Sequence, residues 1–146
     1  MNLETIFSVM STLAMAGWLC LALAPVRRPA LIAAARVIAA LLSLAYVVLI
    51  YRGLTTPGGP EGGGFDSLAK VMILLSVPAT MLPAWIHFLC FDLWVGTWQA
   101  EDAPKSGVPH WLMLPVFFLT FMFGPAGLLT YLVVRLLMSR LRPKAA

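Results

Sequence analysis

Charged residues are scarce in this chain, and their scarcity excludes most classes of soluble protein. Only 11% of the 146 residues are Asp, Glu, Lys or Arg, whereas a soluble domain carries about 25%. Hydrophobic residues make up 61% of the chain, which leaves too little polar surface to face water. The chain therefore needs lipid as its solvent, and we expect one transmembrane domain over residues 1–146.

Cysteine is also nearly absent. Cys20 and Cys90 both lie in apolar runs and far from any CxxC spacing, so neither a disulfide framework nor a thiolate metal site is expected. The net charge of +4 comes from basic residues at the ends of apolar segments. Such positions suit lipid headgroups, so membrane lipids are the expected partners and nucleic acid is not.

Basic residues are missing from the first 24 positions, which argues against a secretory signal. Ala22-Leu23-Ala24 resembles a cleavage box, but Glu4 stands where a signal peptide carries positive charge and Pro25 follows the box. We therefore expect an uncleaved first transmembrane helix.

Four apolar segments are long enough to cross a hydrocarbon core of about 30 Å. They run over residues 5–24, 30–51, 80–98 and 110–137. Before the third segment, Asp66 is an expected N-cap for a short amphipathic stretch over 66–77, and Pro78 is expected to break or kink the chain. The predicted fold is an all-α, integral membrane four-helix bundle with one additional short interfacial or re-entrant helix. No internal repeat is visible.

Four crossings would place both termini on one face of the membrane. That face and the second loop would hold six basic residues: Arg52, Lys70, Arg135, Arg140, Arg142 and Lys144. The other face would hold three: Arg27, Arg28 and Lys105. By the positive-inside rule, both termini are expected in the cytoplasm. The Ala, Arg and Pro usage is typical of bacteria, so the bacterial inner membrane is the expected location.

Asp92 lies within an apolar stretch, where a carboxylate costs about 2.5–3.5 kcal/mol and is normally paired, protonated or functional. Arg36 lies in the second segment, about 10 Å from the end that follows the loop at residues 25–29. Asp92 lies in the third segment, about 9 Å from the end at Trp98, which precedes the loop to the fourth segment. Those ends share a face, so the two residues are expected to pair. The pair could be structural, Arg36 could instead extend alone to the headgroups, or both could floor a substrate pocket.

Three further polar residues gather at the same predicted face: Glu101, Asp102 and His110. His110 exchanges protons near neutral pH, so Asp92 and His110 are candidate acid and base, with Arg36 tuning Asp92. Glu101 and Asp102 either contact substrate or form a solvated connector. The four acid and His residues have metal-ligand chemistry but no diagnostic spacing, so no metal is predicted.

Several residues share the face of Asp92 at spacings near four and seven: Trp85, Phe88, Gly96 and Gln99. They could form a flat slot for a conjugated or isoprenoid ligand, or they could fill the bundle core. His87 lies about 140° around the helix from Asp92, where it either bonds a neighbouring helix or contacts the ligand.

Glycine and proline interrupt the last segment at Gly124-Pro125-Ala126-Gly127. A kink is expected there. Gly124 and Gly127 either let another helix approach closely or let a rigid ligand pass against the backbone.

Four stretches together resemble the abscisic-acid-deficient family of small membrane proteins. They are Trp85 to Gly96, Glu101-Asp102-Ala103, Gly107 to Trp111, and Phe123 to Leu129. The resemblance covers about the C-terminal half, and residues 5–51 resemble the family only in hydropathy. Plant members are required for making neoxanthin from violaxanthin, in which an epoxide opens to an allenic alcohol.

The resemblance implies a membrane protein that acts on a carotenoid or another isoprenoid. The leading interpretation is an isomerase using acid/base chemistry and no cofactor, because the reaction is a net isomerisation. The alternative is a non-catalytic carotenoid- or lipid-binding protein, alone as an oligomer or with a partner membrane enzyme. A transporter is disfavoured because intramembrane polar groups are few and repeats are lacking.

Overall fold

The structure is a computed structural model that describes residues 2–55 and 60–141. All regular structure in these ranges is helical. The elements are α1 Leu3–Ala22, α2 Arg28–Thr55, α3 Leu68–Leu74, α4 Pro78–Lys105, α5 His110–Phe123 and α6 Pro125–Leu141. The predicted all-α class is confirmed. The first two predicted spans, 5–24 and 30–51, begin two residues after the first residues of α1 and α2.

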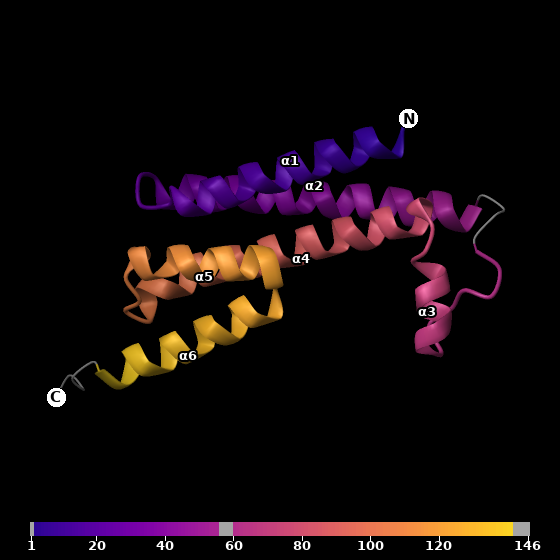
Figure 1. Cartoon of the computed structure of the whole chain (residues 1–146). Helices are drawn as coiled ribbons and strands as arrows, with labels where there is room; N and C mark the ends of the chain where they lie inside the picture. The colour runs from indigo at the N-terminus through magenta and orange to yellow at the C-terminus, as the bar shows by residue number, and fades with distance from the viewer. Residues whose placement is uncertain (1, 56–59, 142–146) are drawn as a thin grey trace.

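Three helices, α1, α2 and α4, are long and apolar enough to cross a membrane. They run antiparallel in sequence order and pack side by side (Figure 1). Large apolar side chains point away from the bundle, including Val37, Leu44 and Phe118, which are about 60% exposed. A soluble monomer rarely exposes contiguous apolar surface of this kind, so these faces suit contact with lipid.

Helix α4 is longer than predicted at both ends. The predicted break between α3 and α4 is present at residues 75–77, and Pro78 is the first residue of α4, since the first helical position needs no backbone N–H donor. At the other end α4 continues to Lys105. It therefore includes Gln99, Glu101 and Asp102, whose polarity is typical of a connector between helices. Those polar side chains find partners on neighbouring helices, so the helix does not need to end at Trp98.

The short helix α3 occupies part of the predicted stretch 66–77 and runs transverse to the long helices (Figure 1). Its N-cap is Ser67, whose hydroxyl accepts from the Lys70 amide at 3.3 Å. Asp66 is therefore not the N-cap, and it instead forms an ion pair with Lys70 Nζ at 2.7 Å.

The predicted fourth span over 110–137 is divided. Helix α5 ends at Phe123, Gly124 takes a φ of +23°, and α6 begins at Pro125. The chain reverses there, so α6 runs back alongside α5 (Figure 1). A methyl group at Gly127 would collide with the backbone of Thr120, so the close packing of the two helices needs glycine at this position.

This hairpin changes the path of the chain. The end of α6 lies near the α1–α2 and α4–α5 turns, at the opposite end of the molecule from the start of α1 (Figure 1). The prediction that both termini share a face depended on a fourth crossing, and the reversal at Gly124 replaces that crossing.

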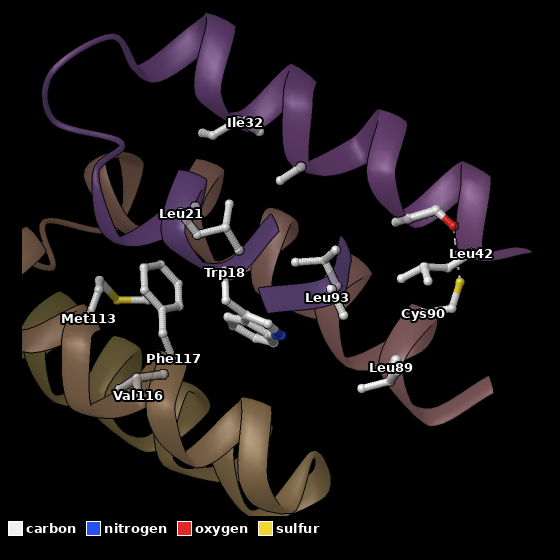
Figure 2. Close-up of a cluster of buried hydrophobic side chains, with 14 of the residues drawn as sticks. Trp18, Leu21, Ile32, Leu42, Leu89, Cys90, Leu93, Met113, Val116 and Phe117 are labelled. Atoms are coloured by element: carbon white, nitrogen blue, oxygen red, sulfur yellow. Dashed lines mark hydrogen bonds between the residues drawn. The ribbon is translucent and has the colours of Figure 1, made fainter. Parts of the chain in front are cut away.

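The core of the described residues is shared by α1, α2, α4 and α5. Figure 2 shows the Trp18 ring of α1 among apolar side chains of α4 and α5, with Leu93 and Phe117 beside it. Gly96 makes this possible, because a Cβ there would lie 2.8 Å from the Trp18 ring. Gly96 therefore lets α1 and α4 pack closely. The Trp18 ring fills the space beside Gly96 that the predicted slot for a flat ligand would need.

Candidate functional site at the hairpin tip

Asp92 lies near the middle of α4, and its carboxylate lies against the tip of the α5–α6 hairpin. A Cβ placed on Gly124 would collide with Oδ1 of Asp92. Among the residues that the structure describes, Asp92 has no hydrogen bond or ion pair to any side chain or backbone group. The carboxylate is thus half-buried beside a break in the backbone, without a charged partner.

The start of α6 lies next to this carboxylate, because Gly124 directly precedes α6. The N-terminus of a helix carries about half a positive charge. No described backbone N–H donates to the Asp92 carboxylate, however. Broken helices whose ends face an ion or substrate near the bilayer midplane are a recurring device of membrane proteins.

A buried polar pair continues from Asp92 along the contact between α4 and α5. Gln99 lies seven residues after Asp92, and its Oε1 accepts from Thr120 Oγ1 at 3.1 Å. Both side chains are fully buried, and Gln99 Nε2 has no partner in the described residues. We call Asp92, Gln99, Thr120 and Gly124 the tip site.

The sequence indicated part of the tip site only. Gln99 was recognised as sharing the face of Asp92, whereas Thr120 was not identified. Thr120 is the only hydroxyl residue between His110 and Phe123, and its place four residues before Gly124 is the pattern that would have revealed it.

Arg36 does not pair with Asp92, so that prediction is wrong. Its Nη2 donates to Glu101 Oε2, and its guanidinium lies 5.9 Å from the centre of the Trp94 ring. Glu101 follows Asp92 by nine residues, which places it about 180° around α4. The depth estimate failed because α4 ends at Lys105 rather than Trp98, which puts Glu101 within reach of Arg36 and leaves Asp92 deeper.

His110 also lies apart from Asp92. It begins α5, and Gly124 lies just beyond the other end of that helix, so about 20 Å of helix separates His110 from the tip. Its Nε2 lies 2.8 Å from the Ala22 carbonyl oxygen at the end of α1. The expected acid/base pair is therefore not assembled, and His110 connects α1 to α5.

Asp102 holds α6 against α4 through a network of side chains. Its Oδ2 accepts from Tyr131 Oη and Arg135 Nε, both at 2.6 Å, and from Ser106 Oγ at 2.8 Å. Tyr131 is fully buried and also packs edge-on against Trp98. We call Asp102, Ser106, Tyr131 and Arg135 the α6 clamp.

The predicted aromatic slot does not surround Asp92. Trp85 donates its indole N–H to Ser11 Oγ on α1 at 3.3 Å. His87 faces α2, where its ring lies 5.6 Å from that of Tyr46. His87 is exposed and has no hydrogen bond in the described part of the chain, contrary to the expectation of a buried, bonded histidine. Phe88 is 55% exposed, one turn from Asp92 on the same stripe.

An apolar groove lies between α1 and α5, on the same side of α4 as the hairpin. Its volume is about 230 Å³. Seven large apolar residues line it, together with Ala22: Met15, Trp18, Leu19, Leu114, Phe117, Phe118 and Phe121. Phe121 stands three residues before Gly124, so the groove extends to within one helical turn of the hairpin tip.

Three spanning helices with a helical hairpin against them define an integral membrane protein of the all-α class. The chain belongs to the ABA DEFICIENT 4-like family, whose description matches residues 5–131. It is thus a membrane protein related to those of neoxanthin synthesis, and the match includes the first two helices. Comparison with curated proteins and with solved structures finds no match.

Proposed function

We propose that the protein is a membrane-embedded isomerase of a carotenoid or another isoprenoid, with Asp92 as its acid/base group. The observation that carries this proposal is the unpartnered Asp92 carboxylate beside the break at Gly124. Ionisable groups inside a membrane segment are costly, and their usual justification is a partner or a function. Asp92 lacks the partner in the described residues.

One carboxyl group is sufficient for an epoxide-to-allene isomerisation. Protonated Asp92 donates its proton to the epoxide oxygen as the adjacent ring carbon–oxygen bond breaks. The other carboxylate oxygen then takes the proton from the neighbouring vinylic carbon, and the electron pair of that C–H bond forms the new double bond. The acid is regenerated and all atoms are retained, so neither His110 nor Arg36 is needed as a second group.

The groove between α1 and α5 supports an apolar substrate. Phe118 is 61% exposed along this groove, behind which the rings of Trp18 and Phe117 are buried, and a long polyene can enter it sideways from the lipid. We propose that the polyene lies along this groove, with its ring end at the tip site.

The test is conversion by the purified full-length protein in lipid nanodiscs supplied with an epoxy-carotenoid such as violaxanthin. We expect a product of equal mass and different retention time on chromatography. Asp92→Asn should retain bound pigment and lose conversion, while Asp66→Asn, an exposed acid on the α3 side, should convert normally. Conversion that survives Asp92→Asn in a folded protein would refute the role of Asp92.

A non-catalytic binding protein is the second candidate, and the apolar groove favours it. In that case the wild-type protein would return the bound carotenoid unchanged, alone or with a partner enzyme. Phe118→Ser would then reduce the amount of copurified pigment, whereas Asp92→Asn would not alter it.

We also propose an orientation in the bacterial inner membrane. In the described residues, the end of the bundle that holds the α1–α2 turn and the end of α6 carries five basic side chains: Arg27, Arg28, Lys105, Arg135 and Arg140. The opposite end of the described chain carries Arg52 and Lys70. The positive-inside rule then places the end of α6 in the cytoplasm and the start of α1 outside.

A further inference from the structure

A cleft of about 530 Å³, lined by charged and apolar side chains, lies between the start of α2 and the end of α4, away from the tip site. Of the described residues that line it, Arg28, Arg36 and Lys105 are basic and Glu101 is acidic. The lining therefore has a surplus of basic over acidic side chains. An anionic ligand is the chemistry that such a surplus favours.

The two arginines keep donors unused. Arg28 donates through Nη1 to the Ala100 carbonyl oxygen at 2.8 Å, and Arg36 donates through Nη2 to Glu101. No bond from their remaining guanidinium N–H groups to another described residue is present, and Arg36 Nε is buried without a partner. A guanidinium offers five donors in a planar fork that fits phosphate oxygens, so both arginines can still bind a phosphate group.

The position of the cleft identifies the source of the phosphate. Arg28 begins α2 and Lys105 ends α4, so the cleft lies at the level of the lipid headgroups. Its remaining wall is apolar and includes Ile32 and Ala33 on α2. One turn deeper, Val37 is 59% exposed on the same helix. An apolar strip therefore leads from the cleft toward the hydrocarbon core.

We infer that this cleft binds the phosphate headgroup of an anionic phospholipid, with an acyl chain running along α2. The site is separate from the tip site, and its lipid is a bound component rather than the substrate of the proposed isomerisation.

The experiment is native mass spectrometry of the full-length protein exchanged into equal amounts of phosphatidylglycerol and phosphatidylcholine. We expect phosphatidylglycerol to be retained preferentially. Arg28→Gln and Lys105→Gln should each weaken its apparent affinity about fivefold, since one basic residue near an anionic surface contributes that much. Glu101→Gln should strengthen it, because the acid is removed and Arg36 is released.

Arg52→Gln is the matched control, since Arg52 is an exposed basic residue at the other end of α2. Equal losses in Arg52→Gln and Arg28→Gln would overturn the proposal, because attraction would then depend on net charge alone. Equal retention of the two lipids, or weaker binding in Glu101→Gln, would overturn it too. Lys105→Gln decides the matter if Arg28→Gln does not fold.

Inorganic phosphate separates the two sources of the headgroup chemistry. It lacks a chain for the apolar strip, so it should leave the melting temperature unchanged where phosphatidylglycerol raises it. An equal rise with inorganic phosphate would assign the cleft to a free phosphate compound instead. None of these measurements depends on carotenoid conversion, so the cleft and the tip site can fail separately.

Discussion

The carboxylate of Asp92 lies against Gly124, the residue at which the last apolar segment reverses direction. This contact joins the middle of α4 to the tip of the α5–α6 hairpin. A glycine is required there twice over, by the positive φ and by the absence of room for a Cβ. The acid on which the proposed chemistry depends is therefore also an element that the hairpin packs against.

Gly124→Ala should destabilise the protein. Gly124 has φ +23° and ψ −83°, a combination that strains a non-glycine residue by about 1–3 kcal/mol, and the collision with Asp92 adds to this. Thermal unfolding in mild detergent measures the loss. If the collision contributes, Asp92→Ala in the same chain should restore part of the stability, which a double-mutant cycle quantifies.

Gly53→Ala is the control for this prediction. Gly53 lies in the last turn of α2, and nothing approaches its added Cβ within 4 Å. Alanine there should be neutral or stabilising by about 0.5–1 kcal/mol. Equal losses at Gly53 and Gly124 would show that the tip geometry is incorrect.

Arg36 should be energetically coupled to Glu101 and not to Asp92. Cycles built from Arg36→Gln, Glu101→Gln and Asp92→Asn measure both couplings by unfolding in detergent. We expect up to about 1 kcal/mol for the Arg36–Glu101 pair, which is 39% exposed on both side chains. Arg36 and Asp92 should be additive within about 0.3 kcal/mol, since they lie on opposite sides of α4 and share no partner. A coupling energy between Arg36 and Asp92 above this value would contradict the structure and support the Arg36–Asp92 pair expected from the sequence.

Tyr131→Phe should loosen α6. The change removes the hydroxyl that donates to Asp102 at 2.6 Å and should cost about 1 kcal/mol. Hydrogen exchange should accelerate in residues 125–141 before it does in α1, because the α6 clamp connects α6 to α4. Tyr51→Phe is the matched control, since Tyr51 is 67% exposed. Similar exchange profiles for the two variants would argue against the clamp.

Hydropathy was sufficient to predict the helical class and most helix positions, because residues 5–51 form two apolar runs separated by a short basic turn. It could not separate a kinked span from a hairpin over 110–137. Both need an apolar segment of about this length with a weak point in the middle. The distinction depends on tertiary packing, in which Gly127 meets Thr120 and Asp102 meets Tyr131.

The candidate site was predicted in part for a related reason. Asp92 is conspicuous in any apolar run, and the sequence identified it together with Gly124. The partners assigned to it, Arg36 and His110, rested on where helices end. In the sequence, Gln99, Glu101 and Asp102 resemble a connector between two helices. Their contacts with Thr120, Arg36 and Arg135 on other helices explain why α4 continues through them.

Labelling of single cysteines distinguishes the hairpin from a fourth crossing. Glu61→Cys lies at the end of the molecule near α3, whereas Val26→Cys and Ser139→Cys lie at the other end. A membrane-impermeant maleimide should label Glu61→Cys in intact bacteria, and the other two only after permeabilisation. Native Cys90 is buried and Cys20 is partly buried in α1, so the parent chain should show little reaction. With four crossings, Glu61→Cys and Ser139→Cys would react alike and Val26→Cys differently, because α6 would end on the same face as the second loop.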